Sequence, residues 1–181
     1  LKIDLDKEID NIINSNNFIH NFRNVMILLG LSVEENYIEE ELKNKDYIIM
    51  ITNQLIIYGM SGFDKVMIFI DDIELNRKTS TSETVIRLTA TYFHEKCHSI
   101  ARKIMKNEYL NSPRGPKIET KLEAGYLGEI FLFGGLILDK NLTIDVHNLK
   151  ENDIDEKIKL MNGLNIMNSG IKCCSFYPFM K

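Results

Sequence analysis

Hydrophobic residues in the first part of the chain recur at helical spacing. Over residues 4–29, isoleucine, phenylalanine and methionine return every three or four positions, with an asparagine-rich interruption at 14–17. This spacing predicts helical structure over the segment, and Gly30 is a suitable place for it to stop. The acidic stretch 33–41 predicts a short second helix on the surface.

The pattern then changes to short apolar runs that are rich in β-branched residues and separated by asparagine and glycine. Such runs predict the strands of a small sheet. The first two runs are close enough in sequence to form a hairpin, and the third directly precedes the next predicted helix. The three runs cover residues 47–51, 54–58 and 66–70.

A capping box, Ser80-Thr-Ser-Glu83, predicts a helix over residues 82–106. One face of this helix is an apolar stripe, in which Cys97 is expected to be a core residue. His94 and His98 fall on the border between the stripe and solvent, and the opposite polar face is expected to be exposed. The stripe is formed by Ile86, Ala90, Phe93, Cys97, Ile100 and Ile104, and the polar face by Lys96, Ser99 and Lys103.

The remaining residues predict a mainly helical C-terminal part. A loop rich in proline and glycine, 111–116, precedes a helix over 119–132 that is expected to end at Gly134. A last helix is predicted over 153–167, ahead of an apolar tail.

Composition is that of an ordinary globular chain. Of the 181 residues, 44% are apolar and 27% charged, and the formal net charge is −4. We expect one domain, 1–181, with the sheet and the histidine-bearing helix in 1–110 and the helical part in 111–181. No basic block and no long apolar run is present, so neither nucleic acid nor a membrane is an expected partner.

The cysteines indicate a reducing environment. There are three, with Cys173 adjacent to Cys174, and this arrangement does not form a disulfide framework. We therefore expect a cytoplasmic location. The chain begins with Leu1 rather than methionine, which leaves open whether a leader was removed.

The chemistry of the chain is concentrated in the pentapeptide His94-Glu95-Lys-Cys-His98, an HExxH motif. Two imidazoles four residues apart on a helix project from one face, where both can bind a single Zn²⁺. Glu95 lies between them, where it can take a proton from a water that the metal activates. We therefore predict zinc as the cofactor and His94 and His98 as two of its ligands.

A catalytic zinc site usually has three protein ligands. The extended motif HExxHxxGxxH is absent, because the chain continues Ser-Ile-Ala-Arg-Lys-Ile after His98. The other common source of a third ligand is a carboxylate on a later helix, and the predicted helix 119–132 contains three glutamates.

Glu123 is the preferred third ligand among these glutamates. On a helical wheel it shares a face with apolar neighbours, and a buried carboxylate is compensated when it binds a metal. Glu129 is the alternative, either as the ligand itself or as a partner that orients a histidine. Glu119 is closer to the loop and is expected to be solvated.

With Glu123 on a following helix, the pentapeptide resembles the gluzincin branch of the zincin metallopeptidases. The run from Glu123 to Gly135, EAGYLGEIFLFGG, also resembles uncharacterised fungal HExxH proteins, and the resemblance spans residues 82–135. It implies an α+β, zincin-like fold: a small mixed sheet packed on the active-site helix, with the third ligand in a mainly helical C-terminal part. Gluzincins have an acidic residue where this chain has Leu127, so Glu129 or a backbone carbonyl must orient the histidines instead.

This resemblance implies a zinc metallopeptidase that hydrolyses peptide bonds of a protein or peptide substrate, with Glu95 as general base. Tyr126 is the candidate donor to the developing oxyanion, with Tyr109 and His147 as alternatives. By analogy with zincin architecture, the strand at 66–70 is expected to be the sheet edge that binds an extended peptide.

Two other interpretations of the motif stay open. In one, the chain is a non-catalytic zinc-binding scaffold or interaction module derived from a zincin fold. In the other, the pentapeptide is incidental to an ordinary amphipathic helix. The presence of Glu95 argues against the scaffold, because a purely structural zinc site has no need of a general base.

Overall fold

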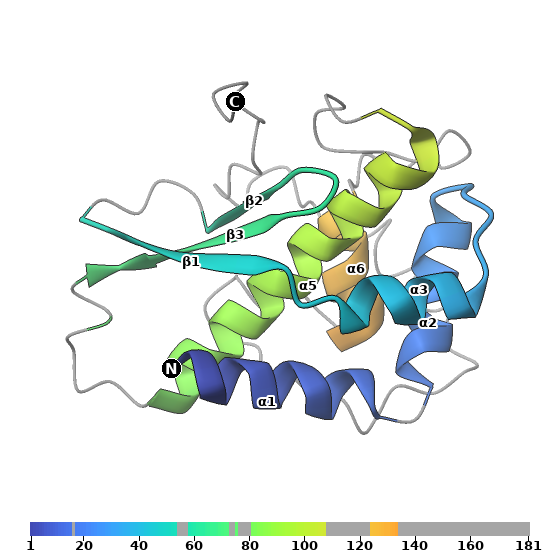
Figure 1. The fold of residues 1–181 in the computed structure, drawn as a ribbon. Helices are drawn as coiled ribbons and strands as arrows, with labels where there is room; N and C mark the ends of the chain where they lie inside the picture. Colours follow the sequence, from blue (N-terminus) through green and yellow to red (C-terminus); the bar gives the residue numbers. More distant parts are fainter. Residues whose placement is uncertain (16, 54–57, 73–74, 76–80, 108–123, 134–181) are drawn as a thin grey trace.

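A computed structural model describes residues 1–15, 17–53, 58–72, 75, 81–107 and 124–133. These residues form an α+β arrangement, as the sequence predicted (Figure 1). The elements in chain order are α1 (Lys2–Ile13), α2 (Phe18–Leu28), α3 (Glu35–Lys43), β1 (Tyr47–Thr52), β2 (Gly59–Ser61), β3 (Val66–Asp71), α5 (Thr81–Met105) and α6 (Ala124–Phe133).

The first helical segment is divided as its sequence predicted. The break between α1 and α2 falls in the asparagine-rich stretch, where Asn17 has a φ of 64°. The second break is at Gly30, whose φ of 75° is the left-handed conformation that glycine adopts without a steric penalty. Just after it, the Leu31 amide donates to the Met26 carbonyl at 2.9 Å, which closes the end of α2. Both predicted boundaries are confirmed.

The strands pair differently from the prediction. The order in the sheet is β1-β3-β2, with β1 parallel and β2 antiparallel to β3. Strand β3 is central, so the placement of strand 66–70 at an edge is wrong. The strand predicted over 54–58, and with it the predicted hairpin to 47–51, falls mostly outside the described residues. A hairpin is formed by β2 and β3, whose turn is closed by a hydrogen bond from the Gly62 amide to the Lys65 carbonyl at 3.0 Å.

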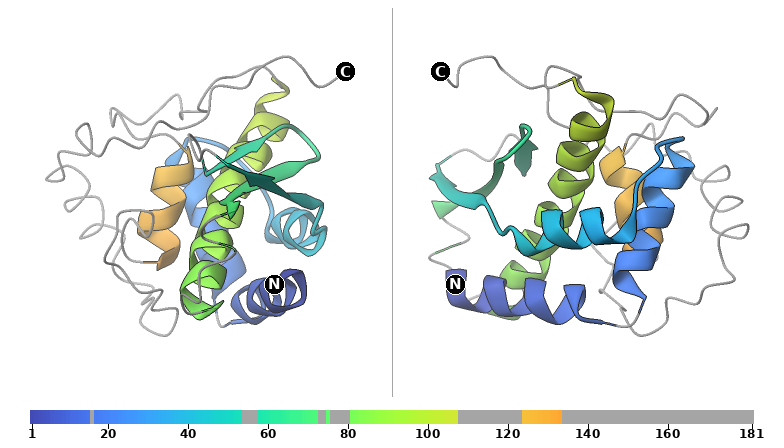
Figure 2. Two further views of the ribbon diagram at one scale, coloured as in Figure 1. Left: turned by 90° about the vertical axis from the view of Figure 1, so that its left-hand side faces the viewer. Right: turned by 45° about the vertical axis from the view of Figure 1, so that its right-hand side comes forward.

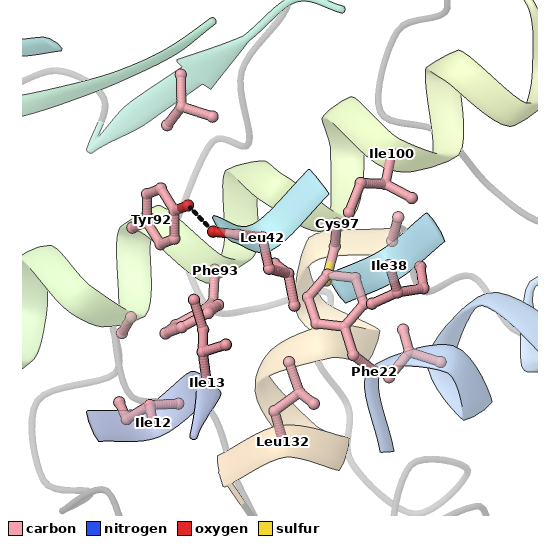
Figure 3. Packing of buried hydrophobic residues seen from close by; sticks show 14 of the residues in the cluster. Ile12, Ile13, Phe22, Ile38, Leu42, Tyr92, Phe93, Cys97, Ile100 and Leu132 are labelled. Carbon is pink, nitrogen blue, oxygen red and sulfur yellow. Dashed lines mark hydrogen bonds between the residues drawn. The ribbon is translucent and has the colours of Figure 1, made fainter. Parts of the chain in front are cut away.

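Helix α5 is covered on opposite sides. The sheet packs against it through β2 and β3, and α6 packs against its other side, next to α2 (Figure 2). Aromatic and aliphatic side chains from α1, α2, α3 and α6 meet it in one core (Figure 3). At the centre of this core the Tyr92 hydroxyl donates to the Leu42 carbonyl at 3.3 Å. Cys97 is fully buried there, as predicted.

Lys96 and Ser99 on the polar face of α5 are buried and Lys103 is half-buried, which corrects the prediction that this face is exposed. Lys96 Nζ donates to the carbonyls of Glu41 and Asn44, at 2.9 and 3.0 Å, at the end of α3. Ser99 Oγ donates to the Phe63 carbonyl at 2.6 Å in the turn after β2. Burial lowers the pKa of Lys96 to about 8. A helical wheel considers one helix alone, so it could not predict burial of this face by segments that are distant in sequence.

Several predicted elements lie outside the described residues: the loop 111–116, the start of the helix 119–132, the helix 153–167 and the tail. Most of the predicted C-terminal part, 111–181, is therefore not described. Among the residues that are described, no helix is long and apolar enough to cross a membrane.

Candidate functional site

His94 and His98 lie one turn apart near the middle of α5 and point toward one another. Their Nε2 atoms are 3.3 Å apart, and the planes of the two rings are inclined at 64°. Both side chains are buried, at 4% and 1% exposure, rather than on the border with solvent as the sequence predicted. Helix α6 packs against α5 and contributes to this burial at His94, through Gly125 and Glu129.

Glu129 on α6 fixes the orientation of His94. Its Oε1 lies 2.5 Å from His94 Nδ1, and both groups are buried. A carboxylate accepts hydrogen bonds, so the proton of a neutral His94 ring is on Nδ1 and the lone pair is on Nε2. The lone pair therefore faces the side where His98 Nε2 lies. This is the tautomer and the carboxylate partner that metal-binding histidines commonly have.

Gly125 brings the backbone of α6 directly against the His94 ring. A Cβ at this position would lie 2.3, 2.4 and 2.5 Å from His94 Nε2, Cδ2 and Cε1. Because these three distances are nearly equal, the added atom would sit over the face of the ring and not along the Nε2 lone pair. Only glycine allows this approach, and Glu129, one turn further along α6, reaches the other nitrogen of the same ring.

Gly128 makes the equivalent approach at Cys97, three residues along each helix. A Cβ at Gly128 would lie 2.4 Å from Cys97 Sγ but 3.5 Å from Cys97 Cβ. The obstacle is thus the sulfur atom alone. Glycines at 125 and 128 together let α6 lie close to α5 beside the histidine pair.

We expect Gly128→Ala to lower the free energy of unfolding by roughly 1–3 kcal/mol, because the added methyl overpacks the helix contact. In a Cys97→Ala background the same change should be neutral or stabilising by up to about 1 kcal/mol, since the sulfur is gone and alanine favours a helix. Urea unfolding of the four proteins measures both effects. An equal cost in the two backgrounds would contradict the close contact.

Glu95 points to the sheet side of α5. It is buried, and Ser61 Oγ on β2 donates to its Oε2 at 2.8 Å. Arg102, also buried, donates through Nη1 to Ser61 Oγ at 2.8 Å and to the Ser61 carbonyl at 2.9 Å. Neither Ser61 nor Arg102 was singled out by the sequence, because nothing local connects position 61 to the pentapeptide.

The structure brings His94, His98 and Glu129 together, with Glu95 on the same helix. Glu129 contacts the Nδ1 side of His94, away from the Nε2 atom that faces His98. Glu123 and Glu119 lie outside the described residues, as do Tyr109 and His147, and so does the side chain of Tyr126 on α6. Within the described part, no group of three or more His, Cys, Asp or Glu side chains is placed to hold a metal ion.

Comparison with other proteins gives no independent assignment. No model of a protein family matches the chain, and no curated protein and no solved structure matches it either.

Proposed function

We propose that the chain is a zinc-dependent peptidase of gluzincin type, with His94 and His98 as zinc ligands and Glu95 as general base. The observation that carries this proposal is the 3.3 Å separation of the two Nε2 atoms, with Glu129 on His94 Nδ1. Two nitrogens bound to one tetrahedral zinc at 2.0–2.1 Å are about 3.3 Å apart. The donor atoms and the pair's geometry thus fit zinc.

Glu123 completes the proposed ligand set. It precedes Gly125 by two residues, and two peptide units span at most about 7.6 Å between Cα atoms. Gly125 in turn lies over the face of the His94 ring. Glu123 is thus the glutamate nearest in sequence to this contact, which favours it over Glu119 as the proposed third ligand. A third ligand of this kind would leave one coordination position for water.

The proposed reaction is hydrolysis of a peptide bond. Zinc, when bound, lowers the pKa of a water and polarises the substrate carbonyl. Glu95 accepts the proton of the attacking water and passes it to the leaving amine. Glu129 holds His94 in the tautomer that binds metal. Tyr126, on the same helix as Glu129, is proposed as the donor to the oxyanion.

We propose β2 as the strand that binds the substrate. It replaces the strand at 66–70, which is central in the sheet and has no free edge among the described strands. Strand β2 is at one edge of the described sheet, is antiparallel to β3, and packs on α5 beside Glu95. No described strand pairs with its outer side, so an extended peptide can add there by main-chain hydrogen bonds. This arrangement supports a zincin-like packing of sheet and active-site helix.

We expect the purified, zinc-loaded chain to cleave an unfolded protein such as casein at neutral pH. A zinc chelator such as 1,10-phenanthroline should abolish the cleavage, and zinc, but not magnesium, should restore it, because nitrogen ligands prefer zinc. Fragments are followed by gel electrophoresis and mass spectrometry. Cleavage that continues in the chelator would contradict the proposal, and a zinc-loaded chain that cleaves nothing would favour the scaffold alternative.

A further inference from the structure

Strand β2 presents two residues to the side chain of Glu95. Gly59 and Ser61 are alternate residues, so they lie on one face of the strand, and both are buried against α5. A Cβ at Gly59 would lie 2.8 Å from Glu95 Cγ and 3.0 Å from its Oε1. Ser61 Oγ contacts the other oxygen, Oε2, at 2.8 Å. The strand therefore confines the Glu95 carboxylate in two ways, by close packing at Gly59 and by a hydrogen bond from Ser61.

The direction of the hydrogen bonds around Ser61 is determined by Arg102. A guanidinium only donates, so the Nη1 contact to Ser61 Oγ, at 2.8 Å, uses a lone pair of the hydroxyl oxygen. The hydroxyl proton is then directed to Glu95 Oε2. A chain of two bonds thus runs from guanidinium to hydroxyl to carboxylate, and each bond polarises the next.

Ser61 links two charged residues that lie on one face of the same helix. Glu95 and Arg102 are seven residues apart on α5, a rise of about 10 Å. Arg102 also donates to the Ser61 carbonyl at 2.9 Å, which fixes the strand position as well as the hydroxyl. All three side chains are buried, at 4% exposure or less, so the bonds are shielded from water.

We infer that Ser61, held by Arg102, is a positioning residue for Glu95. This inference rests on the proposed function, in which Glu95 is the general base. The Ser61 hydroxyl fixes one oxygen of the carboxylate, and with it the plane in which Glu95 meets the attacking water. A displacement of about 1 Å in such a group lowers the rate by roughly 100-fold.

The kinetic test compares Ser61→Ala with Ser61→Thr and with Ser99→Ala. Ser61→Ala should lower kcat on casein-derived peptide by roughly 10- to 100-fold, with KM and bound zinc unchanged. Ser61→Thr keeps the hydroxyl and should restore most of kcat. Ser99→Ala is the matched control, because it also removes a buried hydroxyl that ties α5 to the β2–β3 turn, but at Phe63. Its kcat should stay at the wild-type value.

A second measurement does not depend on activity. In thermal unfolding of Ser61→Ala, Glu95→Ala and the double variant, the losses in Tm should fall short of additivity by about 2–4 °C, because the two residues share one bond. Ser99→Ala combined with Glu95→Ala should be additive. Additive losses for the Ser61 pair, or a kcat in Ser61→Ala no lower than in Ser99→Ala, would overturn the positioning role. A zinc-free or inactive wild type would instead overturn the proposed function.

Discussion

Glu95→Gln is expected to lower kcat for peptide hydrolysis by roughly 10²- to 10⁴-fold while zinc stays bound. Glutamine is the same size as glutamate and can still accept the hydrogen bond from Ser61, but it cannot take a proton from water. Glu95 is not one of the proposed ligands, so the metal content should remain that of the wild type. Both quantities can be measured on one preparation, kcat with a fluorogenic peptide and zinc by mass spectrometry.

The matched control for this variant is Glu40→Gln, which removes the same charge from an exposed position on α3. It should leave kcat and zinc content unchanged. A Glu95→Gln protein with wild-type kcat would show that another group is the base. Loss of zinc together with activity would show that Glu95 supports the site rather than the proton transfer.

Gly125→Ala should weaken zinc binding by roughly 10- to 100-fold, the size of effect that follows when the surroundings of a metal ligand are disturbed. The added methyl would lie 2.3 Å from His94 Nε2, so either the ring or α6 must move. Movement of α6 would also carry Glu129 away from His94 Nδ1. The effect is opposite to helix propensity, which by itself favours alanine by about 1 kcal/mol.

Zinc affinity of this variant can be measured by competition with a chromophoric chelator. The control is Gly128→Ala in the Cys97→Ala background, which makes the same change one turn along α6 without approaching His94. That control should bind zinc as the wild type does. Unchanged affinity in Gly125→Ala would mean that α6 does not lie against His94 as described.

Much of the local structure was predictable from the sequence. The two breaks at Asn17 and Gly30 followed from residue type alone, and the helix predicted over 82–106 corresponds to α5. The helical periodicity also placed Cys97 in the core. Each of these features depends on neighbours in the chain, which is why spacing and propensity were enough.

The features that the sequence did not predict depend on long-range contacts. Strand 66–70 was expected at an edge of the sheet, but β3 pairs with β2 across the turn at Gly62 and with β1 on its other side. Lys96 was expected on the surface, but the end of α3 covers it.

The candidate site was predicted in part. The pentapeptide gave the two histidines and Glu95, and Glu129 was considered both as a ligand and as an orienting partner. The structure places it at His94 Nδ1, in the second of these positions. Ser61 was missed because its contact with Glu95 spans 34 residues of sequence. Glu123 stays a prediction, supported by its proximity in sequence to Gly125.

The most direct test of the proposed zinc site is the zinc content of the wild-type chain and of the double variant His94→Ala/His98→Ala. After equilibration with a small excess of zinc and removal of the unbound metal, the wild type should retain about one zinc per chain, as a site built from this motif requires. The double variant should retain none, and His20→Ala, which changes a partly exposed histidine that pairs with Glu35, should retain as much as the wild type. A wild-type chain without zinc, or equal zinc in the wild type and the double variant, would contradict the proposed metal site.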